Sequence, residues 1–315
     1  MSPRVSFLLR RLGRLLLSLA VVVVATFLLV HLVPGDPVRA SLGPSASPEL
    51  VERVRLELGL DQPVPLQFVN YLTGVVTGDF GDSLQSHRPV ADVIAQRLPA
   101  TLIIAWLAFA LAAMVSLPLG IGTALAARSV KGRGAGTAAN AVLGVIIAIP
   151  DYLLAVALIA VFSIGLGLLP AAGWGEPANM VLPIITLAIG PTAYLARIVF
   201  IEMRTVLDAT YITTARAKRL PARLLYLRHA FPNIVSATLT IGGMMLAGLV
   251  AATVLVETVF AIPGLGTTIV ASITTKDYPM VQGVVLVFAS IVLVMNLVVD
   301  LIILSVDPRS SIAEG

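Results

Sequence analysis

Long apolar stretches, separated by shorter polar segments, run through most of the chain. Six of them contain the roughly 20 mostly apolar residues that a helix needs to cross a bilayer, and they cover residues 12–33, 100–127, 139–166, 182–200, 234–256 and 281–306. The pattern therefore predicts an all-α membrane protein with about six transmembrane helices. The first stretch is too long for the apolar part of a signal peptide and ends without a small-residue cleavage site, so we expect it to remain as a span.

The composition agrees with a membrane protein. Of the 315 residues, 58% are apolar and 12% are charged, and the mean hydropathy is +0.98, whereas about a quarter of the residues in soluble domains are charged. The chain has no cysteine, which excludes a disulfide framework and thiolate chemistry. Its three histidines, His31, His87 and His229, lie far apart in the sequence, so we expect no metal site.

Lysine and arginine cluster in three places along the chain. One cluster precedes the first apolar stretch, the second lies between the second and third stretches, and the third lies between the fourth and fifth. With six spans, all three places fall on one side of the membrane, and positive charge favours the cytoplasmic side. We therefore expect cytoplasmic termini, a cytoplasmic segment at residues 204–233 and an extracytoplasmic segment at residues 34–99.

Part of the expected extracytoplasmic segment has the pattern of a capped amphipathic helix. Ser47 can cap the start, Pro48 and Glu49 suit the first turn, and Gly59 suits the end. One apolar stripe is expected to consist of Leu50, Val51, Val54 and Leu58. Two roles remain open for this segment, a landing surface for an external partner and a lid that shields the ends of the spans.

Motifs for catalysis and for energy supply are absent from the sequence. No G-x-x-x-x-G-K-[ST] stretch is present to hold nucleotide phosphates, and "GRGAGT" at residues 132–137 lacks the lysine. No G-x-S-x-G elbow for a nucleophilic serine is present either. We therefore expect no catalytic residues, no enzyme activity and no cofactor bound by this chain.

The third basic cluster lies in "TYITTARAKRLPARLLYLRHAFPN" at residues 210–233. We expect a short helix over residues 211–220 and a second helix that begins at Pro221 and runs to about His229. Such a pair can dock through its amphipathic helices into a groove of another protein. It can also be a basic loop that sets the topology and meets anionic lipid, and charge alone does not decide between the two.

The letters of this segment resemble the coupling loop of binding-protein-dependent ABC importer permeases, in the form carried by the dipeptide and oligopeptide permease family. "TYITTARAKRL" and "LRHAFPN" match that loop in order and spacing. The family has glycine where this chain has Arg219, so we expect Pro221 to supply the bend, and the docking angle stays open. In the family the loop inserts into a cytoplasmic ATPase, and the resemblance assigns this role to Thr213, Thr214, Ala215, Arg216, Ala217, Lys218, Arg219 and Leu220.

Seven further segments resemble the same family in the same order. They are "HLVPGDPV" at 31–38, "LGLDQPV" at 58–64, "GDFGDSL" at 78–84, "LPATLIIA" at 98–105, "LVETVFAIPGLG" at 255–266, "DYPMVQG" at 277–283 and "NLVVDLI…DPR" at 296–309. The match is closest to the B-type subunit of dipeptide permeases. It implies a first helix within residues 1–33, a type I ABC importer permease core at 100–306 and a cytoplasmic tail at 307–315.

The resemblance also implies the partners and the location of the chain. The partners would be a second homologous permease, ATP-binding subunits that hold ATP and Mg at the cytoplasmic face, and an extracytoplasmic peptide-binding protein. The assembly would lie in the bacterial inner membrane, and no nucleic acid would be a partner. The implied cargo is dipeptides or short peptides, with nickel complexes, glutathione or haem as alternatives. An ion-coupled transporter or channel, and a membrane-embedded enzyme or scaffold, are the rival classes; we find no internal repeat of the kind that secondary transporters carry.

Some residues within the apolar stretches are candidates for a translocation path or an outer gate. Asp151 follows Pro150, which can open the helix there, and its alternative role is a hydrogen bond between helices. The end of the fifth stretch must turn at Pro263, Gly264 and Gly266, either as a gate or as a plain hairpin. Glu257 lies just before this turn. We interpret it, with Arg197 and Asp300, as a structural pair or a snorkelling group.

Overall fold

The computed structural model describes residues 3–32, 36–43, 45–128, 133–221 and 224–306. Within them the chain is helical, apart from one isolated β-bridge between Asp82 and Pro89. Five helices contain a segment that is long and apolar enough to cross a membrane, and they are α1 (Pro3–Leu32), α5 (Val90–Arg128), α8 (Pro177–Asp208), α11 (Phe231–Val259) and α13 (Tyr278–Val306).

The third expected span is not one straight helix. α6 (Arg133–Ile147) is followed by α7 (Asp151–Leu158) and the π-helical stretch η1 (Ile159–Gly165), and the two parts are bent by 97°. The break falls at Pro150, because a proline removes a backbone donor and disfavours helical geometry in the residue before it. The expected opening of the third span at Pro150 is thus present as a sharp bend, and the coarse prediction of about six crossings is confirmed as five helices plus this bent pair.

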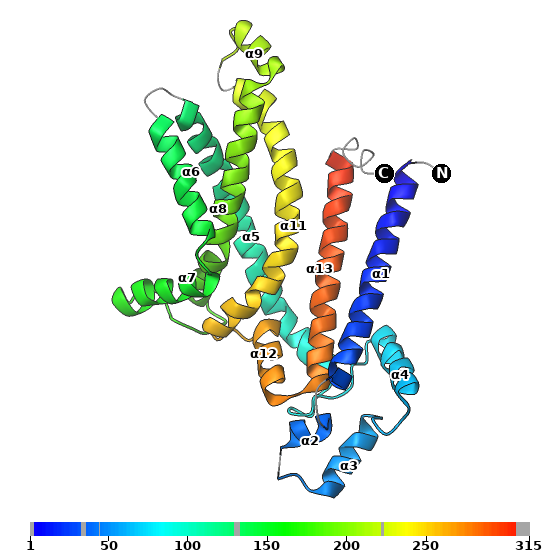
Figure 1. The fold of residues 1–315 in the computed structure, drawn as a ribbon. Coiled ribbons are helices and arrows are strands. Elements are labelled where there is room, and N and C mark those ends of the chain that lie inside the picture. Colours follow the sequence, from blue (N-terminus) through cyan, green and yellow to red (C-terminus); the bar gives the residue numbers. More distant parts are fainter. Residues whose placement is uncertain (1–2, 33–35, 44, 129–132, 222–223, 307–315) are drawn as a thin grey trace.

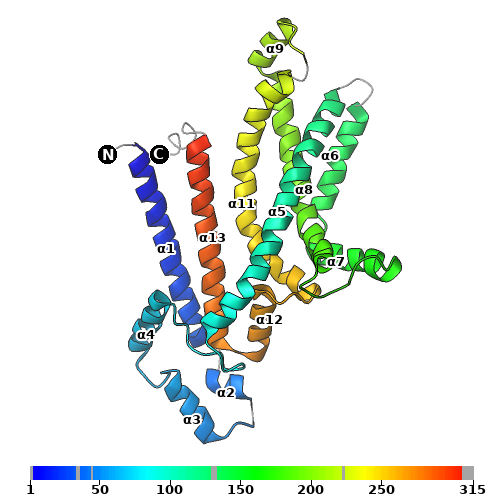
Figure 2. The same cartoon turned by 180° about the vertical axis from the view of Figure 1, so that it is seen from behind.

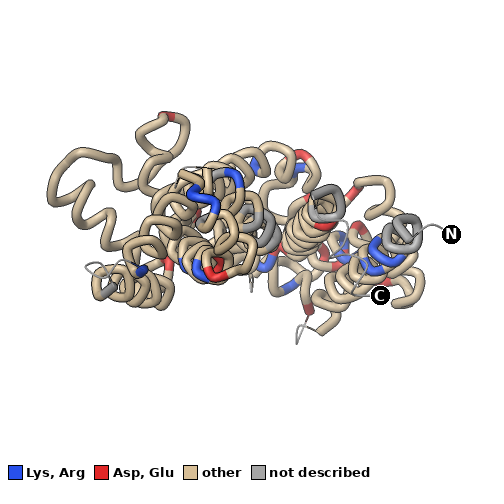
Figure 3. The backbone as a smooth tube through the Cα atoms, turned by 90° about the horizontal axis from the view of Figure 1, so that it is seen from above, with Lys and Arg blue, Asp and Glu red and all other residues tan. Residues whose placement is uncertain are grey.

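The two ends of the bundle differ in what they carry. Both chain ends, the short helix α9 (Thr210–Ala217) and the turn between α5 and α6 lie at one end (Figure 1). The opposite end carries the helices of residues 36–77 and α12 (Leu265–Thr275), as the reverse view in Figure 2 also shows. Figure 3 looks down on the end with α9, where Lys and Arg are visible on α1 and around the centre of the bundle. The three basic clusters of the sequence therefore share one end.

The centre of the bundle is made by α5, α8 and α11, which approach closely through small residues. A Cβ on Gly120 of α5 would lie 2.5 Å from the carbonyl oxygen of Ala196 in α8, and one on Gly243 of α11 would lie 2.5 Å from a methyl group of Val299 in α13. Only glycine permits these approaches, which is a common way for helices to associate in lipid. α1 packs on α13 at the edge of the bundle, where Arg11 pairs with Asp300 at 2.8 Å.

The predicted amphipathic helix is present as α3 (Pro48–Glu57). The Ser47 hydroxyl accepts a hydrogen bond from the backbone N–H of Leu50 at 3.2 Å. Gly59 ends the helix with a φ of +65°, which lets its N–H and that of Leu60 bond back to the last turn. The predicted cap and stop are therefore confirmed, although Leu50 is exposed and does not share the partly buried stripe.

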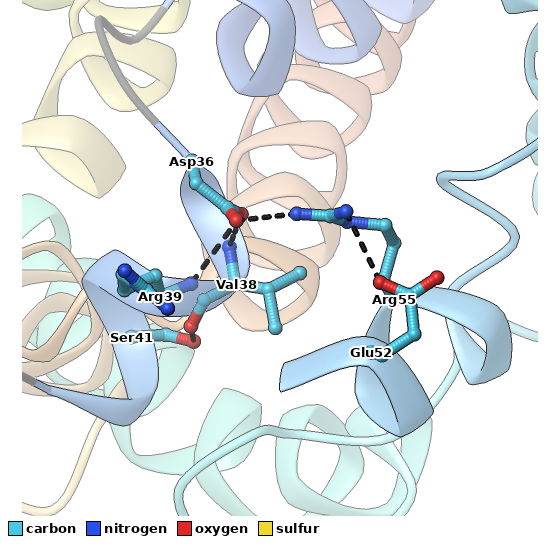
Figure 4. Close-up of polar contacts among 6 residues, drawn as sticks. All are labelled: Asp36, Val38, Arg39, Ser41, Glu52 and Arg55. Carbon is cyan, nitrogen blue, oxygen red and sulfur yellow. Dashed lines mark hydrogen bonds and ion pairs between the residues drawn. The ribbon is translucent and has the colours of Figure 1, made fainter. Parts of the chain in front are cut away.

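A polar cluster joins α3 to the short helix α2 (Pro37–Leu42) (Figure 4). Asp36 caps α2 by accepting from the N–H groups of Val38 and Arg39, and its other oxygen accepts from Arg55 of α3 at 2.5 Å. Burial raises the pKa of Asp36, but the hydrogen bonds from these partners outweigh it, so its pKa lies below the ordinary value. The cluster holds α2 and α3 together.

The sequence pattern did not predict a further helix, α4 (Val64–Thr77). It contains no charged residue, and it exposes large aliphatic side chains at Val64, Leu66, Val69, Leu72 and Val76. Its other face packs on the end of α1, where the Tyr71 hydroxyl is 2.8 Å from that of Thr26. The prolines, glycines and aspartates around α4 made the region look irregular, which hid the helix.

Candidate functional site

The helix α9 and the turn that follows it form an elbow, defined here as residues 209–221 and 224–230. α8 ends at Asp208, because the backbone of Ala209 is extended and its carbonyl accepts the first hydrogen bonds of α9. Arg128, the last residue of α5, pairs with Asp208 at 2.9 Å. The elbow therefore starts at the point where the ends of α5 and α8 are joined.

The inner face of the elbow belongs to the apolar core of the bundle end. Ile212 and Leu225 are buried, together with Ala215, which is 6% exposed. They pack in one cluster with Val199, Met203 and Leu207 of α8 and with Ala124 of α5. Because these contacts span both arms of the elbow and two long helices, a displacement of the elbow has to move the ends of those helices as well.

The residues predicted to dock onto a partner therefore divide into two groups. Ala215 faces inward and Leu220 is partly buried against the same cluster, so neither belongs to a free surface. The side chain of Arg216 lies outside the described residues. The exposed members of the predicted docking set are Thr213, Thr214, Ala217, Lys218 and Arg219.

The bend of the elbow lies at Arg219. Arg219 has a φ of +54°, and the N–H of Leu220 bonds to the carbonyl of Ala215 at 3.3 Å. This is the hydrogen bond of a helix that ends in a left-handed residue. Pro221 instead starts the next helical turn by accepting from Leu224 and Leu225, so the expectation that Pro221 supplies the bend is wrong. A side chain in this conformation costs about 1 kcal/mol.

The second arm of the elbow does not end near His229. The π-helical stretch η2 (Leu225–Ala230) continues directly into α11, whose first residue is Phe231. The elbow and the fifth span are thus one continuous helical path. A π-helical insertion of this kind is frequent at functional positions of helices.

The opposite end of α11 leads into a hairpin, defined here as residues 257–277, in which α12 folds back beside α11. Glu257 is fully buried at its base. One carboxylate oxygen accepts from the Thr101 hydroxyl of α5 at 2.6 Å, and the other accepts from the N–H groups of Gly266 and Thr267 at 2.7 and 3.2 Å. The carboxylate therefore caps the start of α12 and ties three helices together.

The glycines of the hairpin are required by this cap. A Cβ on Gly264 would collide with the Glu257 carboxylate, and a Cβ on Gly266 would lie 2.5 Å from the Cα of Val254. Pro263 directly precedes Gly264 in the turn. The structure thus brings four of the predicted gate residues together, whereas Pro150 and Asp151 lie at the bend between α6 and α7. Glu257 is therefore a buried hydrogen-bond acceptor inside the protein and not a snorkelling group at the membrane surface.

A second buried carboxylate, that of Asp277, closes the other end of the hairpin. It accepts from the Ser83 hydroxyl at 2.5 Å and from the N–H of Leu84 at 3.1 Å. Ser83 precedes α5, so this contact joins the hairpin to the segment between α4 and α5. Sequence reasoning noticed "GDFGDSL" and "DYPMVQG" separately and missed that they meet.

A cavity of about 530 Å³ lies between α1, α4 and the start of α13. Its polar lining includes His31, Gln67 and Tyr71, and burial raises the pKa of Tyr71 against the lowering effect of its Thr26 hydrogen bond. The ring of His31 bonds to Gln67. Tyr71 bonds to Thr26, and His31 bonds to Gln67, so these polar groups of the lining have partners across the contact between α1 and α4.

Residues 116–312 match the family model described as the binding-protein-dependent transport system inner membrane component, and residues 4–105 match the model of its N-terminal part. The chain belongs to this family and is the permease subunit of an ABC importer.

Similar proteins agree with this assignment. A permease of Brucella abortus (strain 2308) named for a peptide transport system is 36% identical over 314 residues, which covers 96% of this chain and 98% of that one. The glutathione transport system permease protein GsiC of Salmonella choleraesuis (strain SC-B67) is 36% identical over 303 residues, with the same shares. The resemblance to the dipeptide and oligopeptide permease family is therefore confirmed.

The fold also matches a solved transporter. The inward-facing MetNI methionine ABC transporter aligns with a TM-score of 0.55 and 18% identity, and it covers 68% of this chain and 96% of the matched chain. At this identity the match concerns the fold alone. It confirms the expected type I permease fold.

Proposed function

We propose that this permease carries short peptides, dipeptides first among them, into a bacterial cell across the inner membrane. A peptide-binding protein outside would deliver the cargo, a second homologous permease would complete the pathway, and ATP-binding subunits inside would bind ATP and Mg and supply the energy. The names of the two relatives support this cargo, since glutathione is itself a short peptide. Glutathione is the second candidate, for the same reason.

The orientation follows from the distribution of charge. The start of α1, the end of α13, the elbow and the adjoining ends of α5 and α6 lie at one end (Figure 1), and this end carries Arg10, Arg14, Lys218 and Arg228. Positive charge favours the cytoplasmic side of a membrane. The elbow and both termini are accordingly cytoplasmic in this proposal, and the segment 36–89 and the hairpin face outward.

The elbow is the site at which ATP-binding subunits would act, and this is the observation that carries the proposal. Its exposed side chains, those of Thr213, Thr214, Ala217, Lys218 and Arg219, can contact a partner, while its buried face is packed on α5 and α8. A partner that prefers different elbow positions in its two nucleotide states would shift those helices. Because η2 runs into α11 without a break, the same shift would reach Glu257 and the hairpin.

Uptake by a reconstituted transporter tests the proposed function. The permease, its second permease, the ATP-binding subunits and the binding protein are placed in liposomes with internal ATP, and uptake of radiolabelled dialanine is measured. We expect uptake that requires both ATP and the binding protein. Uptake by this chain alone, driven by an ion gradient, would contradict the proposal and favour a secondary transporter.

Lys218→Glu tests the role of the elbow surface in the same liposomes. The side chain is exposed, so we expect unchanged thermal stability but weaker copurification of the ATP-binding subunits and at least a tenfold loss of uptake. Arg14→Glu, an equal charge change on exposed surface of the same end but on α1, is the control and should keep uptake within about twofold. Equal effects of the two variants would remove the elbow from the coupling.

A further inference from the structure

The bent helix pair and α8 share a seam that holds two charged groups. A Cβ on Gly144 of α6 would lie 3.4 Å from a terminal nitrogen of Arg197 in α8, and a Cβ on Gly190 of α8 would lie 3.7 Å from a carboxylate oxygen of Asp151. The two contacts are seven residues apart in the bent pair and seven residues apart in α8. They therefore place the end of α6 and the start of α7, on either side of the 97° bend, against one stretch of α8.

Neither charge is neutralised within the described part of the chain. No hydrogen bond or ion pair joins Asp151 or Arg197 to another described residue, and neither side chain is buried. The interior of the seam is filled by the apolar cluster of Leu143, Ile146, Ala193 and Ala196, so the charged groups lie at its edge. Charged groups within membrane-spanning helices face protein or a water-filled path, because lipid cannot solvate them.

Asp151 of α7 and Arg197 of α8 lie along one face of α8 at a defined spacing, because Asp151 is next to position 190. Positions 190, 194 and 197 follow the helical period and share a face, and Tyr194 between them is 41% exposed. Seven helical residues correspond to about 10 Å along the axis of α8. An extended peptide covers at most about 3.5 Å per residue, so two to three residues bridge this distance.

We propose that Asp151 and Arg197 form a transit site for the charged termini of a short zwitterionic peptide. The Asp151 carboxylate accepts hydrogen bonds from the α-ammonium group, and the Arg197 guanidinium donates to the α-carboxylate, both of them charge-assisted contacts. The site rests on the proposed function and adds to it an orientation, with the carboxylate end of the peptide toward the elbow. The site lies at the exposed edge of the seam, where water can compete for both charges. The peptide is therefore held weakly, and weak binding lets the cargo leave the site during transport.

Because the chain has no cysteine, single substitutions to cysteine can test whether the site faces water and cargo. We expect Asp151→Cys and Arg197→Cys, in the assembled transporter, to react with a charged, membrane-impermeant thiol reagent. Dialanine delivered by the binding protein during ATP turnover should slow this reaction. Val21→Cys, which replaces an exposed apolar residue in the span of α1, is the control and should not react. Absence of reaction at both sites, or reaction that cargo does not slow, would overturn the proposal.

Charge removal tests the role of the site in transport. Asp151→Asn and Arg197→Gln should each lower dialanine uptake about tenfold, as expected for the loss of one charge-assisted contact. Glu202→Gln neutralises a charge elsewhere on α8 and should leave uptake within about twofold. If the wild-type transporter takes up dialanine and both variants match it, the site is wrong while the proposed function stands. If the wild type itself takes up none, the proposed function fails.

A further measurement separates cargo contact from subunit contact. Copurification of the second permease should be unchanged in Arg197→Gln. Loss of that permease from the purified complex would show that Arg197 pairs with a neighbouring subunit, and it would overturn the transit site.

Discussion

The hairpin and the elbow both end long helices in tight turns, but they are held by different forces. The hairpin is tied by two buried carboxylates, Glu257 and Asp277, which bond to Thr101 and Ser83 from distant parts of the chain. The elbow is held by apolar packing on α5 and α8, and the ion pair at its base, between Arg128 and Asp208, is largely exposed.

This difference separates a fixed end from an adaptable end. Buried charge-assisted hydrogen bonds demand one geometry and are costly to break, so the hairpin, α5 and the segment before α5 have to move as one unit. Apolar contacts are not directional, so the elbow can shift on its neighbours at lower cost. Variants at both ends test this contrast, in order of decreasing effect.

Glu257→Ala should have the largest effect. It leaves the N–H groups of Gly266 and Thr267 and the hydroxyl of Thr101 without their acceptor inside the protein, so we expect a loss of about 3 kcal/mol in unfolding free energy. Thermal unfolding of the purified permease in detergent measures it. Thr258→Val, which changes the adjacent exposed residue, is the control and should cost less than about 0.5 kcal/mol. Similar losses for both would show that the carboxylate does not hold the hairpin.

Gly266→Ala should cost about 2 kcal/mol, because the added methyl group would lie 2.5 Å from the Cα of Val254 and must push α12 away. Gly122→Ala adds the same methyl group to α5 where nothing lies within 4 Å, and it should be neutral or slightly stabilising. The same unfolding experiment compares the two. A Gly266→Ala protein as stable as Gly122→Ala would contradict the close packing of α12 on α11.

Ser83→Ala removes the hydroxyl that bonds to Asp277 and should cost about 1.5 kcal/mol. The loss should appear locally, as faster hydrogen exchange in residues 79–89 and 272–277. Ser41→Ala is the matched control, because its hydroxyl bonds only within α2. Unchanged exchange in both segments would mean that the bond to Asp277 does not join them.

Arg219→Gly should have the smallest effect and the opposite sign. Glycine adopts a φ of +54° without strain but loses more freedom on folding, so we expect a gain of about 0.5 kcal/mol or less. Slower hydrogen exchange at the amide of Leu220 would report it. Arg219→Ala keeps the strain while it removes the charge, and should show no gain. Faster exchange in Arg219→Gly would indicate that the arginine side chain itself stabilises the bend.

Local features were predictable from the sequence because they depend on neighbouring residues. The apolar stretches predicted the spans, and Ser47 and Gly59 predicted the bounds of α3. The sequence motif around Lys218 predicted the elbow and indicated the family of the protein. α4 was missed because the Pro, Gly and Asp residues around it indicated irregular structure. The bend at Pro150 was only half predicted: its position was recognised, but not the turn of 97°.

The sequence alone determined that the chain is a helical membrane protein, because hydropathy and helix caps act over a few turns of one helix, and its resemblance to a permease family indicated the function. Only the tertiary structure decided what each polar group does. It placed Glu257 against Thr101, 156 residues away, turned Ala215 inward and Lys218 outward, and brought Asp151 and Arg197 to one seam. The physical reason is that these contacts depend on how helices pack against one another, and no local pattern encodes that packing.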